Sequence, residues 1–120
     1  MKEPTTSRFM GLTYGIEYLE VVGEGDRWGE TDHNNRRLSI EHGLPHDHMR
    51  EVVLHETFHQ IAGTAEVGLD PEVEEKVATF FSRALIGHMR DNPTYWRWLL
   101  QKPPKDSTDE PPIDPGGIPG

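Results

Sequence analysis

Val53-Leu54-His55-Glu56-Thr57-Phe58-His59 specifies a helix together with the chemistry that the helix carries. Residues four apart lie one above the other on a helix, so His55 and His59 can bind one metal ion. Imidazole nitrogens bind zinc at about 2.0–2.1 Å. Glu56 projects beside them, where a carboxylate can take a proton from metal-activated water. The stretch predicts a helix with a metal site and Glu56 as a general base.

Length, charge and cysteine content narrow the classes of protein that the chain can belong to. Its 120 residues suffice for one domain with a modest core. A net charge of −9 argues against nucleic acid as a partner. The chain has no cysteine, so histidine and carboxylate must hold any metal. No apolar run is long enough to cross a bilayer, so we expect a cytoplasmic protein without membrane contact.

The first half of the chain predicts a small, mostly antiparallel sheet. Residues 12–22 are rich in branched and aromatic side chains with partial alternation, which is typical of a strand. Residues 28–41 contain the turn-like run 31–35 and predict a hairpin or two short strands. With the helices that follow, the pattern gives an α+β fold, in which the sheet packs on the metal-bearing helix and a second long helix.

Three helices are predicted in the second half. Asp47 is a plausible N-cap for the metal-bearing helix, which should run to about Ala62. Asp70-Pro71-Glu72 supplies a cap, a proline at the first helical position and first-turn acid for the next helix, which Asn92-Pro93 ends. A short third helix is expected over residues 94–101. The domain should span residues 1–102, and the proline-rich segment 103–120 should be a disordered tail.

Apolar periodicity predicts which helical faces are buried. The first helix is apolar around most of its girth, so we expect it to lie centrally. Its buried side chains should be Met49, Val52, Val53, Leu54, Phe58, Ile61 and Ala62. The core stripe of the second helix should be Val73, Val77, Phe80, Phe81, Ala84 and Leu85. The third helix should be anchored by Trp96, Leu99 and Leu100.

A catalytic zinc usually has three protein ligands and one water, so two histidines leave one ligand to find. With Val73 set to zero on a helical wheel, Glu74 lies at about 100°, within the predicted stripe, and Glu75 at about 200°. The phase favours Glu74. Glu75 stays open because a small change in helix roll would turn it inward, and Glu66 in the intervening loop is a weaker third choice.

The segment His55–His59 matches the HExxH motif, and its surroundings narrow the family. Ala62 and Ala65 stand where a metzincin has glycine and a third histidine, which excludes that family. The chain instead resembles the glutamate zincins, in which a glutamate on a later helix completes the site. More closely, it is similar to the compact metallopeptidase-like proteins of phages and prophages and to the ImmA/IrrE group. The resemblance covers roughly residues 14–93.

From this resemblance, His55 and His59 are the expected zinc ligands, Glu56 is the expected general base, and the glutamate ligand falls in Glu74–Glu75. The expected function is zinc-dependent hydrolysis of a peptide or protein substrate, with one zinc per chain. The alternative is a zinc-stabilised binding or regulatory module that cleaves nothing. Candidates for a transition-state stabiliser are His33, His42, His88, Tyr14, Tyr18 and Tyr95.

Overall fold

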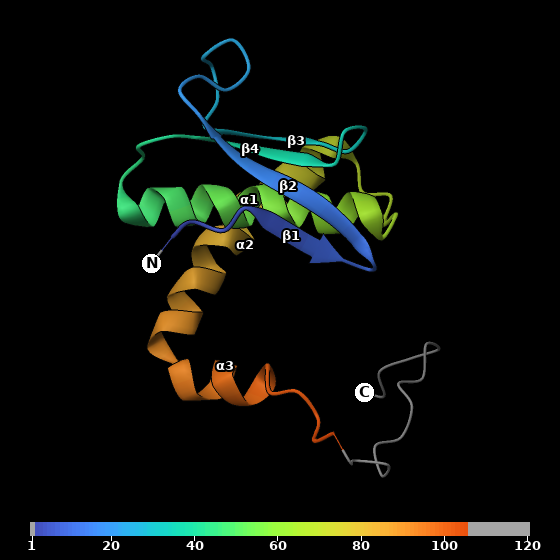
Figure 1. Ribbon diagram of the computed structural model, residues 1–120, viewed down its shortest axis with the longest axis vertical. Helices are drawn as coiled ribbons and strands as arrows, with labels where there is room; N and C mark the ends of the chain where they lie inside the picture. The colour runs from blue at the N-terminus through green and yellow to red at the C-terminus, as the bar shows by residue number, and fades with distance from the viewer. Residues whose placement is uncertain (1, 106–120) are drawn as a thin grey trace.

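The computed structural model describes residues 2–105, which form four strands and three helices (Figure 1). The strands are β1 (Thr6–Phe9), β2 (Leu12–Leu19), β3 (Gly29–Asp32) and β4 (Arg37–Glu41). The helices are α1 (His46–Thr64), α2 (Pro71–Asp91) and α3 (Pro93–Leu99). The predicted α+β class is confirmed.

The sheet is mixed, with the strand order β1-β2-β4-β3. β1 pairs with β2, and β3 with β4, in antiparallel fashion, whereas β2 and β4 are parallel. The β3–β4 hairpin is as predicted. β1 was not predicted, and β2 ends at Leu19, short of the expected Val22. This order leaves β3 at one edge of the sheet.

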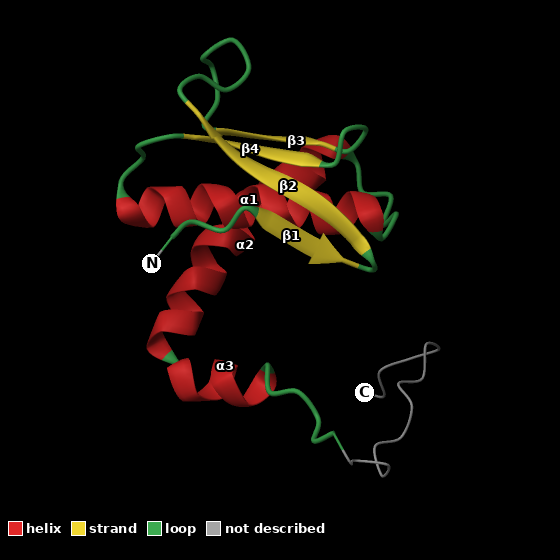
Figure 2. Ribbon diagram, viewed as in Figure 1, coloured by secondary structure: helices red, strands yellow, loops and turns green. Residues whose placement is uncertain are grey.

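The sheet packs on α1 and encloses the main core (Figure 2). The buried cluster consists of Tyr14, Ile16, Leu38, Ile40, Met49 and Val52. Strand alternation explains this set, because Leu38 and Ile40, like Tyr14 and Ile16, are two apart and share one face. The sheet therefore holds α1 from one side only.

α1 differs from its prediction at the start and in its burial. It begins at His46 after Pro45, so Asp47 is not the N-cap, and the carboxylate of Asp47 instead accepts a hydrogen bond from Arg90. Met49, Val52 and Ala62 are buried, but Ile61 is 38% exposed. The predicted central position is confirmed, because the sheet and α2 both pack on α1 and every residue from Glu51 to Gln60 is at least partly buried; only the predicted burial of Ile61 was wrong.

α2 begins as predicted, with the Asp70 side chain accepting a hydrogen bond from the Glu72 amide. Its predicted core stripe was wrong. Phe80 and Phe81 are 68% and 49% exposed, and Val73 is also exposed. The buried residues of α2 are the small Ala78 and Ser82. Small side chains let the helix backbones approach closely, which turns the large apolar residues outward.

α3 extends away from the sheet at the end of α2, as Figure 2 shows. It contains no buried residue, and Leu99 and Leu100 are 47% and 70% exposed. The prediction that these leucines anchor the helix was wrong, because no other element of residues 2–105 covers them. Trp96 is partly buried and donates a hydrogen bond from Nε1 to His88 Nδ1.

Residues 103–105 form no regular element, and the remainder of the predicted tail, 106–120, lies outside the described residues. None of the helices in residues 2–105 combines the length and the apolar character that a membrane span requires.

Candidate metal centre

α1 presents His55 and His59 on one side, one turn apart, as their spacing predicts. Their side chains are only 18% and 15% exposed. The two Nε2 atoms are 3.2 Å apart. Two mostly buried imidazoles with converging nitrogens are a costly arrangement unless a shared partner satisfies them.

Glu75 on α2 supplies that partner. Its Oε1 lies 3.0 Å from His55 Nε2, and its Oε2 lies 2.9 Å from His59 Nε2. Ligand atoms of His55, His59 and Glu75 all lie within 4.8 Å of one another, close enough to bind a metal ion. Tetrahedral ligands at zinc distances stand about 3.3 Å apart, so the observed separations fit such an ion after shifts of a few tenths of an ångström.

Glu74, the glutamate that helical phase favoured, lies on the other side of the His59 ring. Its Oε2 is 2.5 Å from His59 Nδ1, so it contacts the nitrogen that faces away from His55. With a metal bound, a carboxylate in this place would accept from Nδ1–H, fix the ring and leave the lone pair of Nε2 for the metal. The structure thus brings Glu75 to the two Nε2 atoms and Glu74 behind one of them. Glu66 is exposed in the α1–α2 loop and does not join the group.

The charges around His59 favour its protonated form in the absence of a cation. Burial lowers the pKa of His59, but the carboxylates of Glu74, Glu56 and Glu75 outweigh burial and raise the pKa above its usual value. A bound cation would interact with the same carboxylates in place of the proton.

Glu56 is buried, with 6% of its surface exposed, beside the two histidines. Burial raises its pKa, an effect that the hydrogen bond from Thr31 and the charges of His55 and His59 partly offset. Thr31 Oγ1 donates to Glu56 Oε1 at 2.8 Å. The other oxygen, Oε2, lies 4.0 Å from His55 Nε2. The carboxylate is therefore oriented by β3 and points one oxygen toward the metal-binding group.

A glycine in β3 makes room for Glu56. A Cβ at Gly29 would lie 2.8 Å from Glu56 Oε2 and 2.8 Å from Val52 Cγ1. Sequence reasoning missed both Gly29 and Thr31 as site residues. No motif marks them, because their role follows from the close packing of an edge strand on α1.

The group opens into a cleft of about 430 Å³ between β3 and the two long helices. Of the six candidate transition-state stabilisers, only His33 lines this cleft. Its Nδ1 is 2.8 Å from the hydroxyl of the buried Tyr14, and its ring lies against Gly63, one helical turn beyond His59. The others are placed elsewhere: Tyr18 and His42 line a second cavity, and His88 contacts Tyr95 at the α2–α3 junction.

Comparisons with known proteins found no similar protein, so the interpretation of the site depends on its geometry. No family model matches the chain, and no curated protein or solved structure is significantly similar to it.

Proposed function

We propose that the protein is a zinc-dependent peptidase in which His55, His59 and Glu75 bind the metal and Glu56 is the general base. The observation that supports the proposal most is that three donors, two imidazole nitrogens and a carboxylate, converge directly beside the buried carboxylate of Glu56. A purely structural zinc site usually has four protein ligands, whereas three ligands leave a position for water and substrate.

Each residue has a distinct part in the proposed reaction. When bound, zinc supplies a Lewis acid that polarises the scissile carbonyl and makes water more acidic. Glu56 takes a proton from the attacking water and passes it to the departing amine. The raised pKa of Glu56 suits both steps, because a base that also returns the proton works best with a pKa near the operating pH. Glu74 holds His59 in orientation.

β3 offers a place for an extended substrate. It pairs only with β4 among the described strands, so its outer edge carries backbone donors and acceptors for an added strand. Two residues of this strand lie at the general base: Thr31 donates a hydrogen bond to Glu56, and Gly29 packs closely against it. A peptide paired with β3 would therefore run past the general base.

Replacing Glu56 with Gln tests the proposal. The variant should keep one zinc per chain and a near-normal melting temperature, and should lose about 10²–10⁴-fold in hydrolysis of any peptide that the wild type cleaves. Zinc content is measured by native mass spectrometry, and cleavage with a mixed peptide library. Glu66→Gln, an exposed carboxylate outside the site, is the matched control.

Two results would contradict the peptidase proposal. One is equal turnover by wild type and Glu56→Gln. The other is stoichiometric zinc binding with no cleavage by either protein, which would favour the zinc-stabilised binding module.

A further inference from the structure

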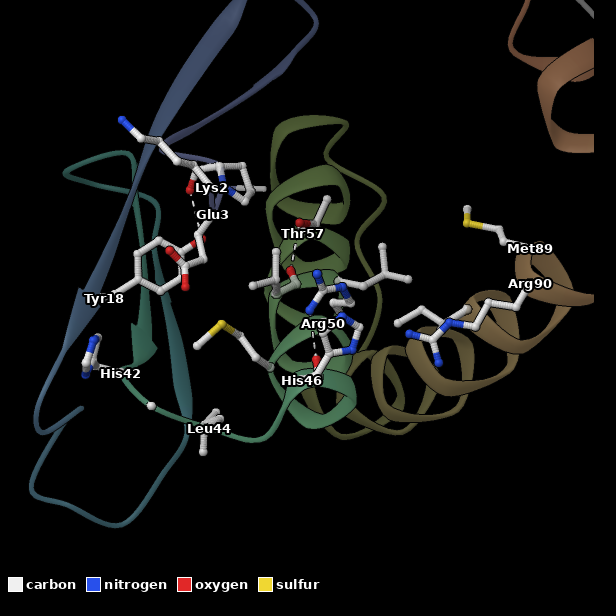
Figure 3. Close-up of a pocket in the computed structure, with 16 residues that line it drawn as sticks. Lys2, Glu3, Tyr18, His42, Leu44, His46, Arg50, Thr57, Met89 and Arg90 are labelled. Carbon is white, nitrogen blue, oxygen red and sulfur yellow. Dashed lines mark hydrogen bonds between the residues drawn. The ribbon is translucent and has the colours of Figure 1, made fainter. Parts of the chain in front are cut away.

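A second cavity, of about 720 Å³, lies beside α1, and Figure 3 shows the residues that line it. Residues 2–4, the β4–α1 loop, α1 and the second half of α2 border it. We call it the α1–α2 groove. Its α1 residues, among them Arg50 and Val53, point away from His55 and His59 on the helical wheel. Whatever binds there does not compete for the metal site.

The groove combines an apolar floor with a basic rim. Met49, Val53, Leu54, Ile86 and Met89 provide the floor. Lys2, Arg50 and Arg90 stand on the rim, where Glu3 is the one acidic lining residue (Figure 3). This is unusual in a chain with 12 basic and 21 acidic residues. The groove therefore suits an apolar segment that carries negative charge.

The rim charges are only partly neutralised by the described residues. Arg90 Nη2 bonds to Asp47 at 3.0 Å, but the Arg50 side chain donates, within the described part of the chain, only to the carbonyl oxygen of His46. Within residues 2–105, neither Arg50 nor Lys2 has a carboxylate within ion-pair distance. An acidic ligand would supply the missing counter-charges.

The segment 106–120 of the same chain has the complementary chemistry. It carries four acidic residues and no lysine or arginine. Between and after these acids stand the apolar Pro111, Pro112, Ile113 and Ile118. Prolines restrict the backbone in advance, so a proline-rich segment loses less entropy when it binds.

The length of segment 106–120 and the place where it follows the described chain also allow it to reach the groove. α3 begins at Pro93, three residues after the rim residue Arg90. Fully extended, the segment that follows Lys105 reaches about 50 Å, and the longest dimension of the molecule is 51 Å. The segment can therefore return to the groove from the end of α3. Because the two are tethered, even a contact of about millimolar strength would be substantially occupied.

We propose that residues 106–120 dock in the α1–α2 groove of their own chain, with the prolines and isoleucines on the apolar floor and the carboxylates facing Lys2, Arg50 and Arg90. The proposal is independent of the peptidase proposal, since it concerns the opposite side of α1.

Paramagnetic labelling of the full-length protein tests the docking. The chain has no cysteine, so Gly116→Cys creates a single site for a nitroxide label. In ¹⁵N spectra, the label should broaden the amides of Val53 and Ile86 in the groove and spare those of Asn34 and Asn35 in the β3–β4 turn, which lies near the other end of α1. The broadening should decrease at about 1 M salt, where surface charges are screened.

Charge reversals on both sides supply the controls. Arg50→Glu with Arg90→Glu should weaken docking about fivefold or more, and Arg36→Glu, at an exposed turn outside the groove, should leave it unchanged. Asp109→Lys with Glu110→Lys should cause the same loss without altering the groove itself. Absence of broadening in the groove overturns the proposal. So does groove broadening of similar size in a mixture of labelled unenriched chains with unlabelled ¹⁵N chains, because the occupant is then a second copy.

Discussion

The two adjacent glutamates at the start of α2 should contribute very differently to zinc affinity. Glu75 contacts the Nε2 atoms of both histidines, whereas Glu74 contacts only the outer nitrogen of His59. Replacing each in turn with Gln removes the charge and keeps the size. The loss of zinc affinity should be larger for Glu75→Gln than for Glu74→Gln. Replacing Glu72, the second residue of the same helix, should change the zinc affinity very little.

The magnitudes follow from the role of each carboxylate. Partners of a ligating histidine typically contribute 10–100-fold to metal affinity, so Glu74→Gln should cost about 1.4–2.7 kcal/mol. Glu75→Gln removes the anionic donor itself, and its loss should exceed about 100-fold. Glu72 is 81% exposed and only 3.8 Å from Lys76, so Glu72→Gln should stay within about twofold.

Competition with a chromophoric chelator at constant pH measures these affinities. Thermal melting of each metal-free variant shows whether the fold is intact before zinc is added. A larger loss of zinc affinity for Glu74→Gln than for Glu75→Gln would refute the geometric assignment and restore the glutamate that helical phase favoured. Equal affinities for all three variants would show that neither carboxylate belongs to the site.

Two other predictions concern stability. Gln60 is fully buried and exchanges two hydrogen bonds with Ser7 on β1, so Gln60→Leu should cost roughly 1–3 kcal/mol in urea unfolding, and unchanged stability would contradict this role. The side-chain and backbone amides of Asn35 hold the pKa of Asp32 below its usual 3.8. Asp32 therefore stabilises the fold above that pH and stops doing so as pH falls through its lower folded pKa. With chelator present, wild type should lose melting temperature more steeply below about pH 4 than Asp32→Asn, and parallel curves would exclude the effect.

The parts of the fold that depend only on residues close together in the chain were predicted from the sequence. The i, i+4 spacing of His55 and His59 requires only that the segment be helical, and the Asp70 cap is set by its own side chain and the next turn. The β3–β4 hairpin likewise depends on a short turn between two adjacent segments.

Features that depend on distant contacts were not predicted. β1 is only four residues long and carries little pattern, and it is held by its pairing with β2 and by the bonds between Ser7 and Gln60. The parallel pairing of β2 with β4 places β3 at the sheet edge, and no local signal specifies that order. The contact of Thr31 with Glu56 depends on it, so these site residues could not be found from the motif alone.

The roll of α2 explains why the helical wheel favoured one glutamate and the structure uses both. The wheel was centred on large apolar residues, but the buried positions are Ala78 and Ser82, which lie at about 140° and 180° when Val73 is zero. Glu74 at about 100° and Glu75 at about 200° then stand on either side of the contact line with α1. From one side a carboxylate reaches the outer nitrogen of His59, and from the other it reaches both Nε2 atoms. The small side chains bring the helices close enough for this, so a bulky residue at Ala78 would separate both carboxylates from the histidines together.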